Sequence, residues 1–238
     1  MKGLPLVLLH GYPFDHTIWD RVIAHLGPDR KFITPDLRGF GSSRASGEPS
    51  IEAMADAVAG AIPGEAVIAG FSMGGYVTLA LADKYPHLIA GIALINSQTL
   101  ADSDEVRQGR RTIIEKVKKD GIRPAVDAAL PKLFGKQEPN LVQSALKGAE
   151  RAGPEGIMWG LEAMARRPDR TAVLQRHGKP VLIIHSPDDK FIPVSRARDL
   201  AKLLGGAKYV EIAGPGHCTP LEAPDKVAAA LREFIDGR

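Results

Sequence analysis

Three side chains whose types suit nucleophilic chemistry lie far apart in the sequence: Ser72, Asp189 and His217. A serine hydroxyl is a poor nucleophile until a base removes its proton, and an imidazole with an ordinary pKa near ~6.5 can do so at neutral pH. A carboxylate beyond the imidazole fixes its tautomer and stabilises its protonated form. Together these residue types could carry out acyl transfer if the fold brings them into contact.

The surroundings of Ser72 indicate a sharp turn between a strand and a helix. Gly70, Ser72 and Gly74 form the pattern G-x-S-x-G, which follows the apolar run 66–69 and precedes a helical pattern over 76–84. The glycines two before and two after the serine are needed because a Cβ atom there would collide with neighbouring backbone. The backbone N–H of Met73 then lies at a helix N-terminus, where it can stabilise an oxyanion.

Short apolar runs alternate with helical patterns along most of the chain, which predicts an α/β fold with a mostly parallel sheet of about six strands. The expected strands are 4–9, 31–34, 66–69, 89–95, 181–184 and 208–212. Between 97 and 177 only helical patterns occur, broken by glycine and proline. We therefore expect a core formed by 1–96 and 178–238, with a helical cap at 97–177.

The predicted strands explain why distant residues could meet. Ser72, Asp189 and His217 each follow the carboxyl end of a predicted strand, as does the loop that begins at His10. Ligands bind outside these ends in parallel sheets. The same sheet edge is therefore expected to hold all three side chains.

The composition excludes several classes of protein. The chain has 238 residues, a net charge of +3, 5% aromatic residues and one cysteine, Cys218. Dispersed charges and few aromatics argue against a nucleic-acid partner, and no run approaches the roughly 18 apolar residues of a membrane span. The seven histidines show no metal-ligand spacing, so neither metal nor cofactor is expected. A single cysteine and no apparent targeting segment suggest the cytoplasm.

Five motifs in this order resemble the α/β-hydrolase-fold enzymes that carry a helical cap, over nearly the whole chain. They are the oxyanion loop His10-Gly11-Tyr12-Pro13, the loop 35–43, the elbow 70–75, an acid loop D-x-x-x-P at 189–193, and the histidine loop 214–217. The order serine, acid, histidine is also the one found in these enzymes. Their usual antiparallel hairpin before the oxyanion strand has no room here, so strand 4–9 is expected near an edge of a small sheet.

The resemblance implies a role for each motif residue. Ser72 would be the nucleophile, His217 the base and Asp189 the acid, while the backbone N–H groups of Tyr12 and Met73 would form the oxyanion hole. Asp188 remains an alternative acid, although the spacing to Pro193 favours Asp189.

Other candidate residues have weaker support from the sequence. Apolar residues at helical spacing are usually core residues, but four of them could line an acyl pocket: Trp19, Met158, Trp159 and Met164. His10 is expected to bond into nearby loops, Asp36 and Arg38 to tie their own loop together, and Cys218 to be a small buried residue.

The favoured reaction is hydrolysis of a small carboxylic ester through an acyl-enzyme, with a small-molecule ester or lactone as the partner. Enol-lactone hydrolysis is the main alternative, because the compact chain with a helical lid also resembles 3-oxoadipate enol-lactonases. Carbon–carbon bond hydrolysis, a perhydrolase, a lyase or a non-catalytic receptor on the same scaffold are further possibilities. The sequence does not indicate an oligomeric state.

Overall fold

The centre of the molecule is a parallel sheet of six strands, in a computed structural model that describes residues 1–237. The strands are β1 (Leu6–Leu9), β2 (Phe32–Ile33), β3 (Ala66–Phe71), β4 (Ile89–Ile95), β5 (Val181–His185) and β6 (Lys208–Glu211). Their order is β2-β1-β3-β4-β5-β6, and every neighbouring pair is parallel. The predicted α/β class with six strands is confirmed, and β1 is next to the edge strand.

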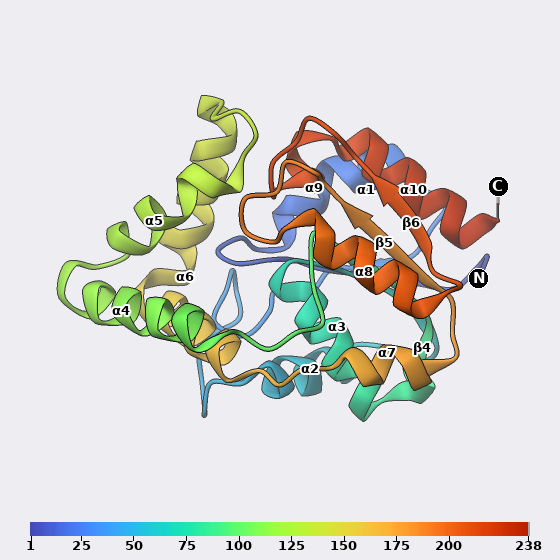
Figure 1. Cartoon of the computed structure of the whole chain (residues 1–238), viewed down its shortest axis with the longest axis horizontal. Helices are drawn as coiled ribbons and strands as arrows, with labels where there is room; N and C mark the ends of the chain where they lie inside the picture. Colours follow the sequence, from blue (N-terminus) through green and yellow to red (C-terminus); the bar gives the residue numbers. More distant parts are fainter. Residues whose placement is uncertain (238) are drawn as a thin grey trace.

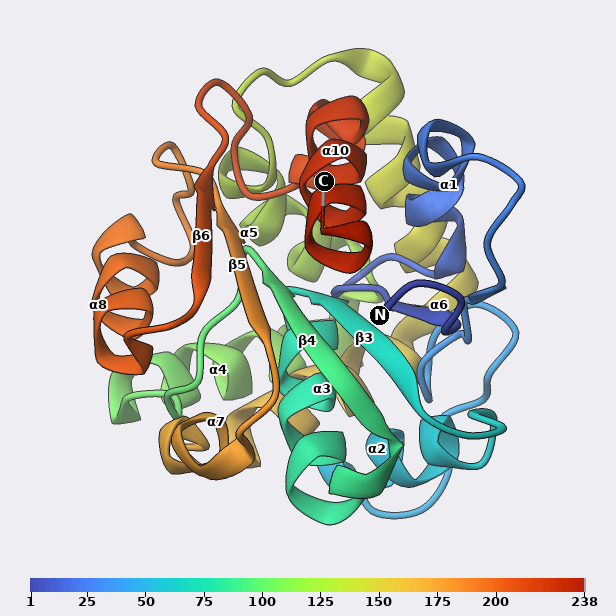
Figure 2. The same cartoon turned by 90° about the vertical axis from the view of Figure 1, so that its right-hand side faces the viewer.

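Helices cover both faces of this sheet. One face is covered by α1 (Asp20–Leu26) and α10 (Pro224–Asp236), and the other by α2 (Ile51–Ala59), α3 (Met73–Lys84) and α8 (Val194–Leu204) (Figure 2). Successive residues of β1 point to opposite faces, so Leu6 and Leu8 join one core cluster while Val7 and Leu9 join the other. Burial on both sides explains the continuous apolar run in this strand.

Three helices between β4 and β5 form a separate body at one end of the molecule (Figure 1). They are α4 (Asp104–Asp120), α5 (Arg123–Leu133) and α6 (Pro139–Arg166). Helix α6 is bent at Gly153, whose φ of 63° is non-helical, directly before Pro154. We call α4–α6 the cap. The next helix, α7 (Thr171–His177), contacts α3 and α8 of the core instead.

The remaining elements are short. Two 3₁₀ turns, η1 (His16–Trp19) and η2 (Pro86–Leu88), precede α1 and β4, and α9 (Thr219–Glu222) follows the last strand. Several expected boundaries shift by one to three residues. Helix α3 begins directly after Ser72 instead of at 76, and β1 begins after Pro5 instead of at 4. Among residues 1–237, no helix is both long and apolar enough to cross a bilayer.

Candidate active site

Ser72 occupies a strained turn between β3 and α3. Its φ of 51° and ψ of −114° lie in a region that residues other than glycine rarely adopt. The turn is tight enough that a Cβ on Gly70 would meet the Gly74 carbonyl oxygen at 2.3 Å, and one on Gly74 would meet the Leu9 carbonyl oxygen at 2.2 Å. Both glycines are therefore required by backbone contacts, and the turn presents the Ser72 side chain outside the sheet.

The three side chains singled out in the sequence form a continuous hydrogen-bonded chain. The distance between His217 Nε2 and Ser72 Oγ is 2.8 Å, and the distance between His217 Nδ1 and Asp189 Oδ2 is 2.7 Å. An ionised carboxylate only accepts hydrogen bonds, so Nδ1 carries the proton and Nε2 is left with a lone pair facing the serine hydroxyl. This tautomer can accept the serine proton.

Four hydrogen bonds fix the Asp189 carboxylate. Its Oδ1 accepts from the backbone N–H groups of Phe191 at 2.8 Å and Ile192 at 3.0 Å, and its Oδ2 accepts from His217 and from Asn96 Nδ2 at 2.9 Å. Burial alone would raise the pKa of Asp189, but the electrostatic interaction with the His217 ring and these hydrogen bonds outweigh it and lower the pKa to about 2. The group therefore stays ionised at neutral pH.

Asp188 faces a different partner. Its Oδ2 accepts from the backbone N–H of Gly214 at 3.0 Å, which joins the acid loop to the histidine loop. Of the two neighbouring carboxylates, the structure brings Asp189 and not Asp188 into contact with His217.

Aromatic rings hold the imidazole of His217 from two sides. The ring centroids of Phe71 and Phe191 lie 5.2 and 5.0 Å from that of His217, and His217 is only 3% exposed. Phe191 itself is 40% exposed. The imidazole is therefore shielded from solvent, while Phe191, which packs against it, is partly exposed.

The loop after β1 lies directly against the Ser72 turn. A Cβ on Gly11 would be 2.8 Å from the Phe71 ring and 3.0 Å from Ser72 Cβ, so the following residue, Tyr12, lies next to the serine. Met73 is the first residue of α3, and its N–H has no partner within the helix because the first N–H groups of a helix are unpaired. Both predicted oxyanion donors are thus carried by segments that flank Ser72.

His10 and Asp36 tie the neighbouring loops together. His10 is fully buried, and its Nε2 accepts from the backbone N–H of Leu37 at 2.9 Å. Burial lowers the pKa of His10 to about 4. Asp36 accepts from backbone N–H groups of His16 and Ser42, which keep its pKa below the usual range although burial opposes them.

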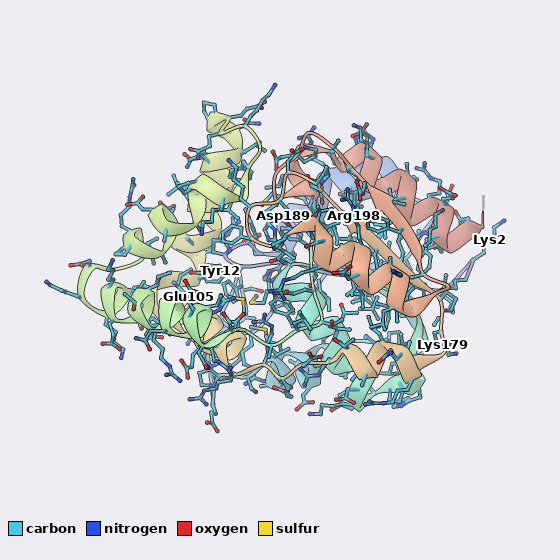
Figure 3. All side chains as sticks on the ribbon, viewed as in Figure 1. Lys2, Tyr12, Glu105, Lys179, Asp189 and Arg198 are labelled. Atoms are coloured by element: carbon cyan, nitrogen blue, oxygen red, sulfur yellow. The ribbon has the colours of Figure 1, made fainter. Side chains whose placement is uncertain are left out.

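A cavity of about 500 Å³ lies between the cap and the core, with Ser72 and His217 in its wall. Figure 3 labels Tyr12 and Glu105, which both line it, where the cap helices meet the core, whereas Lys2 and Lys179 lie toward the opposite end. A cavity of this size can hold a small organic molecule. Met164, one of the expected pocket residues, also lines it.

The other three expected pocket residues lie elsewhere, which corrects the prediction. Trp19 is fully buried in the core cluster between the sheet and α10, because the helical spacing that suggested it belongs to the core face of η1 and α1. Trp159 is 6% exposed, and its Nε1 donates to the Gly47 carbonyl at 3.2 Å. Met158 packs against the same core cluster as Trp159. None of the three lines the cavity.

Several contributors to the site were missed in the sequence. Asn96 bridges Asp189 and Thr219, since its Oδ1 accepts from Thr219 Oγ1 at 2.8 Å. Ser97 Oγ donates to the Ser72 carbonyl at 2.9 Å. Their position directly after β4 was the available signal, because polar residues at strand ends border the ligand side of a parallel sheet. No sequence pattern around Phe191 indicated its contact with His217.

Two further groups, a thiol and a cluster of possible metal ligands, are either buried or already hydrogen-bonded. Cys218 is fully buried, and burial raises the pKa of its thiol. Asp15, His16 and Asp36 lie close enough together for metal ligation, but Asp15 already pairs with Arg151 and accepts from Thr17, while Asp36 accepts from His16 and Ser42.

Comparison with known proteins identifies the family of the chain. A family described as "Alpha/beta hydrolase family" matches residues 6–230. The chain belongs to the alpha/beta hydrolase family. Nearly the whole length takes part in the match, including the Ser72 turn, the acid loop and the histidine loop.

Individual relatives cover almost the full chain. A pimeloyl-[acyl-carrier protein] methyl ester esterase of Aromatoleum aromaticum is 29% identical over 252 residues, which is 100% of both chains. A thermophilic esterase from Thermogutta terrifontis, solved with malate bound, has a TM-score of 0.93 and 33% identity over 99% of this chain and 90% of that one. The enol-lactonase from Burkholderia xenovorans LB400 has a TM-score of 0.89 and 26% identity over 99% and 92%.

Proposed function

We propose that the protein is a serine hydrolase that cleaves small carboxylic esters through an acyl-enzyme intermediate. The observation that carries the proposal is the hydrogen-bonded chain from Asp189 through His217 to Ser72 in the wall of a cavity. Relatives named as esterases add support. In this scheme the core of the molecule holds the reacting groups and the cap closes the substrate cavity.

The reaction begins with attack of Ser72 Oγ on the ester carbonyl carbon, while His217 Nε2 takes the hydroxyl proton. Negative charge then develops on the carbonyl oxygen, where the N–H groups of Tyr12 and Met73 act as donors. Asp189 stabilises the imidazolium through Nδ1–H. His217 passes its proton to the leaving alcohol, and water, deprotonated by the same imidazole, releases the acid from Ser72.

Lactone hydrolysis is a second candidate, supported by the enol-lactonase from Burkholderia xenovorans among the similar structures. The same groups would open a cyclic ester, with the alcohol remaining attached to the product. Rates on matched open-chain esters and lactones would separate the two substrate classes.

The proposal is tested by hydrolysis of p-nitrophenyl butyrate. Replacement of the nucleophile in Ser72→Ala is expected to lower kcat by roughly 10⁴–10⁶-fold. Ser195→Ala, at an exposed position at the start of α8, provides a matched control that retains wild-type activity. A fluorophosphonate should label the wild-type protein and not Ser72→Ala.

Two results would contradict the proposal. A wild-type protein that neither turns over short esters and lactones nor reacts with the fluorophosphonate would indicate a non-catalytic binding protein. A Ser72→Ala variant as active as the Ser195→Ala control would place the nucleophile elsewhere.

A further inference from the structure

Helix α4 of the cap presents a mixed polar and apolar face to the cavity. Val106, Gly109, Arg110 and Ile113 all line it, and their spacing of three and four residues places them on one side of the helix. Arg110 brings a positive charge to this otherwise small and apolar row, and Glu105, in the first turn of the same helix, also lines the cavity. The cavity therefore has a serine in its core wall and a guanidinium in its cap wall.

One buried carboxylate, Asp102, holds this guanidinium in place. Arg110 Nε donates to Asp102 Oδ2 at 2.6 Å, while Arg167 Nη1 is 2.7 Å from Oδ1 of the same carboxylate. Arg167 also stacks over the Tyr76 ring, with Cζ 4.0 Å from the centroid, and donates to the Met164 carbonyl at 2.8 Å. Two guanidinium groups thus share one carboxylate, which leaves this cluster with an excess of one positive charge.

The shared contact uses only a small part of the hydrogen-bonding capacity of Arg110. A guanidinium offers five N–H donors, and within residues 1–237 only Nε–H of Arg110 has a protein partner. The Arg110 side chain is 19% exposed, between the fully buried and the solvated extremes. A partly desolvated cation with free donors favours an anion that can accept them in a bidentate geometry.

Positive groups outnumber negative ones among the remaining charges around the cavity, where Lys132, Lys190 and Arg196 stand against one carboxylate, Glu105 on α4. Four basic and two acidic residues line it, and one of the two acidic residues is the already paired Asp102. The other three basic residues, Lys132, Lys190 and Arg196, are exposed and have no ion-pair partner among the described residues. They would attract a negatively charged molecule toward the opening, in the way that clefts lined by one sign of charge steer ligands.

The phenol of Tyr12 adds a neutral donor at the same place. Tyr12 lines the cavity next to Ser72. Burial raises the pKa of its hydroxyl, and the nearby charge of Arg110 opposes this only in part. The hydroxyl therefore stays protonated and can donate a hydrogen bond at neutral pH.

We propose that Arg110 forms an anion subsite, so that the preferred substrates are esters or lactones that carry a free carboxylate away from the bond to be cleaved. This inference rests on the proposed hydrolase function and specifies its substrate class. The guanidinium holds the carboxylate against the cap, and the chain between the two groups spans the cavity toward Ser72. With a neutral substrate of the same length, Arg110 keeps only its contact with Asp102, and its other N–H donors find no acceptor on the substrate.

The experiment compares two series of substrates on the full-length protein. Monomethyl esters of straight-chain dicarboxylic acids of four to eight carbons are paired with methyl esters of monocarboxylic acids in which a methyl group replaces the free carboxyl group. Wild type is expected to favour the charged member of at least one pair by about tenfold in kcat/KM. In Arg110→Gln this ratio should fall by about 10- to 100-fold, mainly through KM, with partial recovery in Arg110→Lys.

Controls separate this inference from general damage and from the proposed function. Arg111→Gln changes an exposed neighbour on α4 and should keep the wild-type ratio. Thermal unfolding identifies variants that fail to fold, in which case Arg110→Lys carries the test. If no ester is cleaved at all, binding of adipate and glutarate by calorimetry still tests the subsite, because dicarboxylate binding that weakens in Arg110→Gln needs no catalysis.

The inference fails if wild type prefers the neutral ester at every chain length, or if Arg110→Gln retains the wild-type ratio. Dicarboxylates that bind wild type and Arg110→Gln equally, or that do not bind at all, would also overturn it.

Discussion

At the scale of single residues, the site depends on how completely Asp189 is surrounded by donors. Two backbone N–H groups, an amide and an imidazole all donate to one buried carboxylate. Such a group has a single orientation, because rotating it would leave buried donors without partners. The fixed carboxylate in turn orients the His217 ring through Nδ1, so that Nε2 points toward Ser72.

Asparagine at position 189 should therefore damage the proposed reaction far more than asparagine at position 188. In Asp189→Asn the amide can present N–H to His217 Nδ1, which favours the wrong imidazole tautomer, and kcat should fall on the order of 10⁴-fold. Because the pKa of Asp189 is about 2, the carboxylate is ionised throughout pH 4–9, and the loss should appear across that whole range. Initial rates with p-nitrophenyl butyrate measure it.

Asp188→Asn is the matched control, since the Asp188 carboxylate accepts from the Gly214 N–H and an amide oxygen can replace it in that contact. A similar loss in both variants would mean that the effect comes from loop geometry and not from the contact with His217.

His10 should make stability depend on pH. Burial lowers its folded-state pKa from 6.5 to about 4, so the unfolded chain takes up the proton first as the pH falls. Its contribution to the free energy of unfolding is complete above pH 6.5 and is lost progressively toward pH 4, by about 3 kcal/mol in total. Urea unfolding at several pH values should show this slope, and it should be flatter in His10→Gln.

Replacement of an exposed histidine, His25→Gln, provides the comparison. A slope equal in wild type and His10→Gln would show that other groups cause the pH dependence.

Sequence reasoning was most successful for residues whose chemistry needs a special backbone. Ser72 could be located because its turn requires Gly70 and Gly74, and the structure shows backbone oxygen atoms where their Cβ atoms would lie. Arg110 could not be found in this way. Its importance comes from which side of α4 faces the cavity and from sharing Asp102 with Arg167, and both depend on tertiary packing.

At the scale of elements, the turn between β3 and α3 is packed against the end of β1. Gly74 is the point of closest approach, because a Cβ there would lie 2.2 Å from the Leu9 carbonyl oxygen and 2.7 Å from that of His10. Helix α3 and the loop that carries Tyr12 are thereby held at a fixed separation.

Gly74→Ala should force these two elements apart. Overpacking typically costs about 1–3 kcal/mol, and backbone atoms cannot move aside as side chains do, so we expect a loss at the upper end of that range. Urea unfolding measures the stability, and kcat for p-nitrophenyl butyrate should fall as well because the donors around Ser72 shift.

Gly206→Ala is the control, because a Cβ at Gly206 meets no atom within 4 Å. Equal stability of the two alanine variants would show that the turn can relax without cost.

Element types were predictable from the sequence because short continuous apolar runs indicate strands buried on both faces, whereas spacing of three and four residues indicates helices. Strand β4 was even predicted with its observed bounds, Ile89–Ile95. Helical spacing, however, does not say which neighbour a face contacts. Trp19 and Trp159 have the spacing expected for pocket residues, yet both lie in core clusters. The assignment of a helix face to cavity or core required the positions of the other helices.

At the scale of the whole molecule, ion pairs tie the cap to the core. Arg151 and Arg166, both on α6, pair with Asp15 and Glu48 of the core. Asp15 is only 2% exposed, whereas Glu48 is largely exposed. The first pair should therefore contribute more to cap attachment than the second, since solvent screens exposed pairs.

Loss of both arginines should loosen the cap without affecting the sheet. In the double variant Arg151→Gln, Arg166→Gln we expect amide hydrogen exchange in α4–α6 to become about 3- to 10-fold faster, which corresponds to about 1 kcal/mol after allowance for screening. Exchange in α10 should not change.

Arg123→Gln is a suitable control, because Arg123 pairs with Asp127 inside α5 and, within residues 1–237, makes no ion pair with the core. Equal exchange in the control and the double variant would show that apolar packing alone holds the cap.

The position of the cap in the strand order has a consequence for how such proteins can diversify. The chain leaves the sheet at the end of β4 and returns in β5, and these strands are direct neighbours in the sheet. Because these strands are parallel, the connection starts at the carboxyl edge of the sheet, near Ser72, and returns through α7 to the amino end of β5; its described elements are all helices. Segments of very different length or composition can replace one another here during evolution. Substrate selectivity can then change while Ser72, Asp189 and His217 keep their positions.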